Sequence, residues 1–118
     1  MECDGNMTIS TSKLISINNP MSIDLDEEFN RWYNNVHIPE VMSLPNICGV
    51  TRYRAKTQLR PSSRQAPYLY FNIYDLIEPS AVAKEIMGKE AHFSPSDAID
   101  LDGTISTIYE PFFTFTRK

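Results

Sequence analysis

The stretch "YLYFNIYDL", Tyr68 to Leu76, constrains the fold of this 118-residue chain more than any other. Its residues alternate between two chemical classes, and this is the period of a β-strand whose two faces meet different surroundings. One face carries Leu69, Phe71 and Ile73, and the other carries Tyr68, Tyr70, Asn72 and Tyr74. The alternation therefore predicts a strand with two chemically distinct faces.

Three further strands and a helix are predicted around this stretch. β-branched residues alternate with polar ones over residues 8–17, and a second alternating run covers residues 49–58. The last strand is expected over residues 104–118, with an interruption or bulge at Pro111. Pro79 begins a predicted helix over residues 79–90.

Another helix is predicted after Asp24, a plausible N-cap with Glu27 at the capping-box position. Its buried face is expected to consist of residues that share one narrow arc of the helix, Leu25, Phe29, Trp32 and Val36. Pro39 disfavours a helical conformation in the residue before it, so we expect this helix to end near His37. Residues 39–44 are predicted to form a short second helical turn, which Pro45 closes.

The order of these elements is β-α-β-β-α-β, the ferredoxin-like pattern of an α+β subunit with one four-stranded antiparallel sheet. Two helices cover only one face of such a sheet, and Leu69, Phe71 and Ile73 suit that covered face. The other face would then display the tyrosines and Asn72, too much aromatic area to leave in water without purpose. We therefore expect two sheets to pack face to face in a homodimer, which would bury these residues or line a cavity with them.

Length and charge limit the possible partners. The chain fits a single domain, which we place at residues 8–118 after a disordered leader at residues 1–7. The leader has no basic n-region, so we expect no secretory signal, and no run of about 18 apolar residues predicts a membrane span. A net charge of −4 argues against nucleic acid or an anionic membrane as a partner.

The two cysteines, Cys3 and Cys48, follow no metal-ligand spacing, and His37 and His92 supply no local zinc pattern. We therefore predict no metal site. Cys3 lies in the expected leader, which argues against a structural disulfide. Together with the missing secretory signal, this favours a reducing, cytoplasmic setting.

A family resemblance becomes visible between Asn19 and Arg54, "NPMSIDLDEEFNRWYNNVHIPEVMSLPNICGVTRYR". This passage resembles the opening of the dimeric α+β barrel superfamily, particularly its EthD-like members. Those proteins often show an F-x-x-W-Y-x-x-x-H-x-P core, then a proline and an R-Y pair that enters the second strand. The matching residues here are Phe29, Trp32, Tyr33, His37, Pro39, Pro45, Arg52 and Tyr53.

The resemblance covers roughly a third of the chain closely, and the remainder only through the order of elements. It implies paired ferredoxin-like subunits with a ligand cleft between sheet and helices in each. Superfamily members include polyketide cyclases, muconolactone isomerases, dehydratases, cofactor-free quinone-forming monooxygenases, haem-degrading enzymes and hydroxynitrile lyases. Fold alone therefore does not select a reaction.

His37 is the leading catalytic candidate, with Tyr33 one helical turn before it. An imidazole that titrates near neutral pH suits proton abstraction next to a carbonyl, or proton donation to a leaving hydroxyl. Tyr33 is placed to hydrogen-bond His37 or a substrate carbonyl. The alternative is that His37 caps its helix by bonding terminal carbonyls. A site role predicts that at least one ring nitrogen of His37 is open to a cavity.

Seven further residues are expected to contact the substrate: Trp32, Val41, Met42, Arg52, Tyr70, Asn72 and His92. Each of the more distinctive ones also has an ordinary explanation. Trp32 lies at the centre of the apolar stripe and suits the core, and Arg52 suits a strand surface. Tyr70 and Asn72 fit a plain dimer interface as well as a cavity lining, and His92 lies in a loop that is either a lid or simply solvated.

The sequence contains no Gly-rich phosphate loop, serine-nucleophile elbow or thiol motif. We therefore expect a cofactor-independent lyase, isomerase or cyclase acting on a small, largely apolar, aromatic or polyketide-like substrate. Two alternatives remain open at this point. One is a non-catalytic protein that binds a small molecule, and the other is a cofactor-free or haem-using monooxygenase of the same fold.

Overall fold

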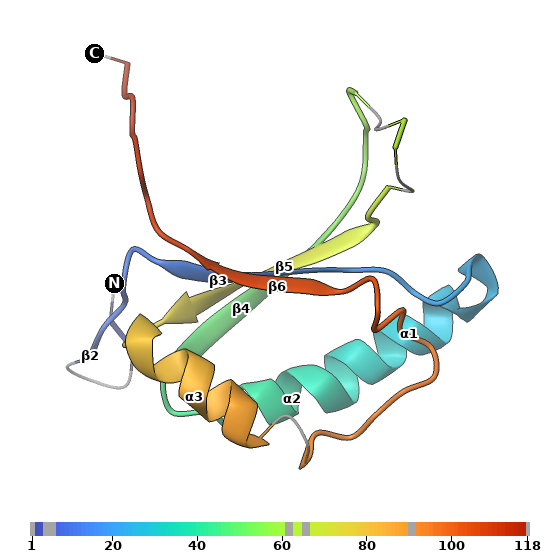
Figure 1. Cartoon of the computed structure of the whole chain (residues 1–118), viewed down its shortest axis with the longest axis horizontal. Helices are drawn as coiled ribbons and strands as arrows, with labels where there is room; N and C mark the ends of the chain where they lie inside the picture. Colours follow the sequence, from blue (N-terminus) through green and yellow to red (C-terminus); the bar gives the residue numbers. More distant parts are fainter. Residues whose placement is uncertain (1, 4–6, 61–62, 65–66, 90–91, 118) are drawn as a thin grey trace.

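The computed structural model describes residues 2–3, 7–60, 63–64, 67–89 and 92–117 of the chain. Its main sheet is antiparallel and contains four strands in the order β4-β5-β3-β6. These are β3 (Lys13–Asn18), β4 (Ile47–Arg54), β5 (Tyr70–Leu76) and β6 (Ile105–Tyr109). The helices lie together on one side of the sheet (Figure 1). The predicted α+β, ferredoxin-like subunit is therefore confirmed.

The remaining elements agree with the predicted order. Helix α3 (Pro79–Lys89) occupies the predicted range as far as the structure describes it. Strand β6 ends at Tyr109, before Pro111, and the following segment leaves the body of the protein in an extended conformation (Figure 1). This segment exposes three phenylalanines, Phe112, Phe113 and Phe115.

The structure differs from expectation in the N-terminal residues and at one cysteine. The expected leader lies partly outside the described residues, but β1 (Glu2–Cys3) and β2 (Met7–Thr8) pair as a separate two-stranded antiparallel sheet. Cys48, which we expected outside any structural disulfide, is disulfide-bonded. The single-domain boundary at residues 8–118 stays a prediction. No helix within the described ranges is long and apolar enough to cross a membrane.

The first helical segment does not end near His37. It runs through η1 (Ile23–Leu25), α1 (Asp26–Trp32), η2 (Tyr33–His37) and α2 (Ile38–Val41), and the backbone at His37 and Ile38 is helical. Asp24, the expected N-cap, lies inside η1. The stretch η2 is a π-turn, which is wider than an α-turn. We attribute the tolerance of Pro39 to this wider turn, which gives the proline ring room against the preceding carbonyls.

The π-turn also changes which helical residues are buried. A regular α-helix advances by about 100° per residue, so residues spaced four apart drift around its axis. Because a π-turn has more residues per turn, it rotates the following residues partway back toward the buried face. Phe29, Tyr33 and Val41 are accordingly the most buried residues of the segment, whereas Trp32 and Val36 are only half-buried. Tyr33 is therefore a core residue, although it was not among the four residues expected on the buried face.

The two faces of β5 are reversed relative to the sequence expectation. Tyr70, Asn72 and Tyr74 are 7%, 0% and 2% exposed and lie under the helices, whereas Phe71 is 38% exposed on the open face. The ring centroids of Tyr70 and Phe29 are 5.4 Å apart, so the tyrosine face is the one that packs on the helix. The physical reason is that the polar groups of this face find hydrogen-bond partners inside the protein.

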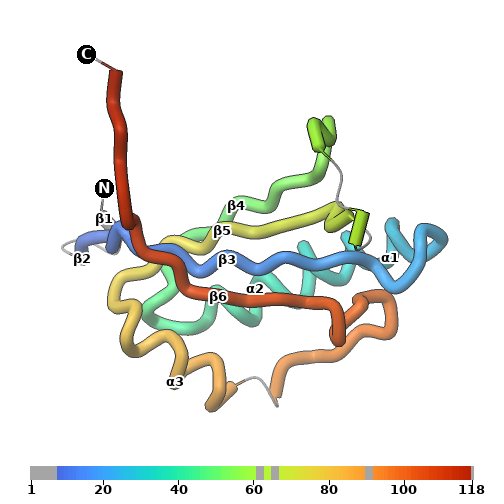
Figure 2. Tube along the Cα trace, turned by 45° about the horizontal axis from the view of Figure 1, so that its top comes forward, coloured from blue at the N-terminus to red at the C-terminus, as the bar shows by residue number. Residues whose placement is uncertain are grey.

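The segment that follows α3 closes the space between helices and sheet. Residues 92–104 run from the end of α3 toward α1 and then turn into β6 (Figure 2). Two backbone hydrogen bonds hold this segment to the chain after β3: Met21 N donates to Ala98 O, and Asp100 N donates to Asn19 O. The side chain of Trp32 also donates from Nε1 to Ser94 O at 3.2 Å. These contacts hold the segment in place, and other residues of it line the cavity described below.

Candidate functional site

A cavity of about 360 Å³ lies between the helical segment and the β3 and β6 part of the sheet. Its aromatic wall is formed by Trp32, Tyr33, His37, Tyr74 and Phe93. Its hydroxyl-bearing lining comes from both neighbouring strands and the connecting segment, and consists of Ser16, Ser94, Ser96, Thr104 and Ser106. The volume falls within the range of small-molecule sites.

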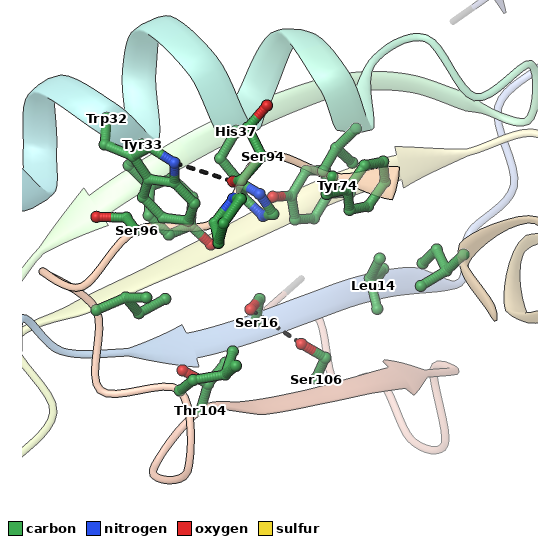
Figure 3. Close-up of a pocket in the computed structure, with 16 residues that line it drawn as sticks. Leu14, Ser16, Trp32, Tyr33, His37, Tyr74, Ser94, Ser96, Thr104 and Ser106 are labelled. Atoms are coloured by element: carbon green, nitrogen blue, oxygen red, sulfur yellow. Dashed lines mark hydrogen bonds between the residues drawn. The ribbon is translucent and has the colours of Figure 1, made fainter. Parts of the chain in front are cut away.

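His37 lies within the aromatic wall (Figure 3). Its ring stacks on Trp32 with centroids 4.9 Å apart and an angle of 22°, and Phe93 meets it edge-on at 5.8 Å. Burial lowers the pKa of the His37 imidazole below its usual value of 6.5. The ring is therefore neutral at neutral pH and able to accept a proton.

A cavity lies beside His37, and the catalytic role of the residue stays a prediction. His37 Nδ1 is buried and makes no hydrogen bond among the described residues, and the helix continues beyond it to Val41. The stacking against Trp32, rather than a bond from Nδ1 to a terminal carbonyl, is what orients the ring.

Tyr33 lines the cavity, and its hydroxyl group is hydrogen-bonded within the protein. Its hydroxyl oxygen accepts hydrogen bonds from Asn18 Nδ2 at 3.0 Å and from Asn72 Nδ2 at 2.6 Å. The hydroxyls of Ser16 and Tyr74 are also hydrogen-bonding neighbours of this oxygen, so the Tyr33 hydroxyl is the centre of a buried polar network. Burial raises the pKa of the Tyr33 phenol, which keeps its proton on the oxygen at neutral pH.

Arg52 lies behind Tyr33 and outside the cavity lining. Its guanidinium carbon is 4.2 Å from the centroid of the Tyr33 ring. Arg52 Nε donates to Asn72 Oδ1 at 3.1 Å, and the NH1 nitrogen donates to Asn34 Oδ1 at 2.7 Å. Burial lowers the pKa of the guanidinium, but an arginine stays charged in this range. Arg52 is therefore placed to polarise Tyr33 rather than to touch a ligand.

The structure brings together four of the sequence-predicted site residues at the cavity: Trp32, Tyr33, His37 and Val41. Tyr70 lies further along the sheet, where its hydroxyl donates to Asp26 Oδ1 and accepts from Asn30 Nδ2. Asn72 donates a hydrogen bond to the Tyr33 hydroxyl and does not line the cavity. These two residues, with Arg52, were expected to contact substrate and do not line the site.

Met42 and His92 are also separate from the cavity. Met42 packs against the neighbouring apolar core, and His92 is exposed at an open hollow near Glu40 and Lys89. The prediction missed Tyr74, Phe93 and the hydroxyl residues. For Ser16 a signal was available, because Leu14, Ser16 and Asn18 share one face of β3 and place polar groups in register with a buried apolar residue.

Two solved structures are similar to this chain. The crystal structure of HapK from Hahella chejuensis gives a TM-score of 0.57 at 16% sequence identity, over 91% of this chain and 99% of that one. An ethyl tert-butyl ether D (EthD) family protein from Bacillus halodurans gives 0.50 at 14% identity, over 89% and 100%. No protein-family profile and no curated protein sequence matches the chain. At these identities the likeness establishes the fold alone.

Proposed function

We propose that the cavity is the active site of a cofactor-independent enzyme of the lyase, isomerase or cyclase type. The observation that carries this proposal is the position of His37, a half-buried and neutral imidazole on the wall of a cavity of small-molecule size. In a site of this kind, a neutral imidazole removes a proton from the carbon next to a substrate carbonyl. The same group returns the proton at another atom, or gives it to a leaving hydroxyl.

Tyr33 is the second group in this proposal. When a proton leaves the substrate carbon, negative charge develops on the carbonyl oxygen. The two amide donors to the Tyr33 oxygen and the nearby Arg52 cation make the phenol a stronger hydrogen-bond donor to that oxygen. His37 thus acts as the base, and Tyr33 stabilises the enolate that forms.

Proton exchange at carbon tests the role of His37 without knowledge of the natural substrate. The probe is 1-tetralone, a neutral bicyclic ketone with exchangeable protons beside its carbonyl. In D₂O, the protein should accelerate deuterium incorporation, measured by NMR. His37→Gln should lower that acceleration by about 10² while leaving the far-ultraviolet circular dichroism unchanged.

The matched control is His92→Gln, which replaces the exposed histidine outside the cavity. It should exchange at the wild-type rate. Equal exchange by wild type and His37→Gln would remove His37 from the catalytic role. Binding of the ketone without any acceleration would favour the alternative of a non-catalytic small-molecule-binding protein.

We also propose that the protein is a homodimer formed through the open face of the sheet. This face carries Ile15, Ile17, Phe71 and Ile73, with Tyr53 stacked on Phe71 at a centroid distance of 4.7 Å. Tyr53 is 44% exposed and Phe71 is 38% exposed, and the helices lie on the opposite side (Figure 1). An apolar surface of this extent is typical of a protein interface. The face is the reverse of the one we expected from the sequence.

A further inference from the structure

The cavity beside His37 has two chemically different walls. Figure 3 shows Trp32, Tyr33 and His37 on the helical side, and Ser16, Ser106 and Thr104 across the cavity on the sheet side. The helical wall is built of rings, and Trp32 and His37 are nearly parallel, at 22°. The sheet wall presents hydroxyl groups. A ligand in this space therefore meets a flat apolar surface on one side and small neutral polar groups on the other.

The sheet wall has a hydroxyl proton to spare. Ser16 and Ser106 are directly opposite each other in the β3 and β6 pairing, and their Oγ atoms are 3.0 Å apart. Ser16 is 6% exposed, and its Oγ also accepts from Asn18 Nδ2 at 3.4 Å. Each hydroxyl has one proton, and a single hydrogen bond between the two uses only one of them. Ser16 is also a hydrogen-bonding neighbour of the Tyr33 hydroxyl. When Ser16 donates to Ser106, the O–H of Ser106, an exposed residue of the edge strand, is left for a ligand.

Thr104 differs from this pair because it can offer a ligand an acceptor oxygen but no proton. Its Oγ1 donates to the backbone oxygen of Asp100 at 2.9 Å, so its proton is already engaged. Its oxygen remains an acceptor. The sheet wall thus combines one hydroxyl donor with one hydroxyl acceptor. The donor suits a ligand carbonyl oxygen, and the two together suit a ligand hydroxyl.

Two charged groups lie beside the aromatic wall, and both are engaged by protein partners. The Glu40 carboxylate accepts from the backbone and the hydroxyl of Ser94. The Arg52 guanidinium lies against the far side of Tyr33 and donates to Asn72 and Asn34. The polar side chains of the described lining are hydroxyl residues, Trp32 and His37, and none of them is charged at neutral pH, because burial lowers the pKa of His37. Moving a carboxylate or an ammonium from water into such surroundings is costly without an opposite charge.

We propose that the ligand of this cavity is a neutral, flat, largely apolar molecule with a carbonyl or hydroxyl oxygen, anchored by that oxygen at Ser16 and Ser106. Its ring system lies against Trp32 and His37. The proposal rests on the proposed function in placing the substrate in this cavity, and it adds the charge, shape and polar end of that substrate. Because Ser16 is a hydrogen-bonding neighbour of Tyr33, the anchored oxygen is the same carbonyl oxygen that Tyr33 stabilises in the proposed function, and the adjacent carbon lies toward His37.

The single tryptophan of the chain, Trp32, makes this proposal directly measurable. Because Trp32 lines the cavity, its fluorescence reports on occupancy. Three probes share one bicyclic skeleton: 1-tetralone carries a neutral carbonyl, tetralin carries no oxygen, and 1,2,3,4-tetrahydro-1-naphthoate carries a carboxylate. Titrations are corrected for probe absorbance and repeated by calorimetry.

We expect 1-tetralone to bind about tenfold more tightly than tetralin, which corresponds to about one hydrogen bond. The carboxylate should bind more weakly than either. These titrations use the unaltered protein, so they do not depend on a variant that folds. Failure of all three probes to bind, equal affinities, or tightest binding of the carboxylate would each overturn the proposal.

A serine variant locates the anchor. Ser106→Ala should weaken 1-tetralone binding about fivefold to tenfold and leave tetralin unchanged, because only the ketone uses the hydroxyl. The control is Ser80→Ala at the exposed start of α3, which should leave both affinities unchanged. If the two probes lose affinity equally in Ser106→Ala, the serine anchor is wrong.

The proposed chemistry and the proposed ligand class fail in different ways. Selective binding of 1-tetralone without deuterium exchange would contradict the acid/base function and support the ligand class. Exchange that depends on His37, together with binding that ignores Ser106 and favours the carboxylate, would support the function and contradict the ligand class.

Discussion

The two faces of the main sheet differ in the opposite sense from most antiparallel sheets. A sheet that packs helices on one side usually turns apolar residues inward and polar residues outward. Here the covered face carries hydroxyl and amide groups, at Ser16, Asn18 and Asn72, while the open face carries Ile15, Ile17 and Phe71. The covered face therefore holds more polar groups than a core needs, and the open face holds more apolar area than water favours. We relate the first excess to the proposed binding site and the second to the proposed homodimer surface.

The polar interior is stable because most of its groups bond one another. Tyr33 joins Asn18 to Asn72, Asn72 joins Arg52, and Ser16 joins Ser106. Three buried atoms among the described residues keep no hydrogen-bond partner: Asn18 Oδ1, His37 Nδ1 and one Arg52 nitrogen. Unpaired buried groups lower stability, so their concentration around Tyr33 and His37 agrees with selection for a site.

The largest effect is expected from a charge at the centre of the open face, which should prevent dimer formation. Phe71→Glu should convert the dimer to a monomer and raise its dissociation constant at least about 100-fold, because a carboxylate would lose its hydration at the interface. Light scattering coupled to size exclusion measures the mass. Met87→Glu, on the exposed side of α3, is the matched control and should stay dimeric. A wild-type protein that is monomeric at micromolar concentration would contradict the proposed interface.

The covered face is tested by removing one oxygen. Tyr33→Phe leaves the amide groups of Asn18 and Asn72 without their shared acceptor, and should lower the free energy of unfolding by about 2 kcal/mol. Urea denaturation at fixed protein concentration measures this change. Tyr53→Phe makes the same chemical change on the open face, where the phenol is 44% exposed, and should change stability by less than about 0.5 kcal/mol. Equal effects at the two positions would mean that the amide bonds to Tyr33 contribute nothing.

A smaller effect is expected from pH. Since burial holds the pKa of folded His37 below 6.5, the unfolded chain binds a proton at pH values where the folded chain does not. Stability should therefore be greatest above about pH 6.5 and should fall as the pH drops toward the folded pKa. His37→Gln should remove this part of the pH dependence, whereas His92→Gln should keep it. An unchanged profile in His37→Gln would show that the imidazole titrates normally.

The order of elements was predictable because it depends on local signals. Alternation located β5, and Pro79 marked the start of α3. The assignment of faces was not predictable in the same way. Polarity suggested that Asn72 and its tyrosine neighbours face outward, but their partners, Tyr33 and Asn18, are far away in the sequence, and a single strand does not reveal them.

The residues of the candidate site also differ in how far local sequence could predict them. His37 and Tyr33 belong to one helix and were found from their spacing of four residues. The serine pair was missed because Ser16 and Ser106 come from opposite ends of the chain and meet only through the register of β3 and β6. The continued helix was missed because the rule applied at Pro39 assumes a regular α-helix, and η2 is not one.

The π-turn has a consequence for aligning this chain with its relatives. A π-turn has one more residue between bonded groups than an α-turn, so it is equivalent to an insertion of one residue in a helix. A relative without it requires a one-residue gap between Tyr33 and His37, and an ungapped alignment would match letters that occupy different positions in space. A homologue with a histidine four residues after its tyrosine but a regular α-helix between them would therefore carry that histidine on a different side of the helix.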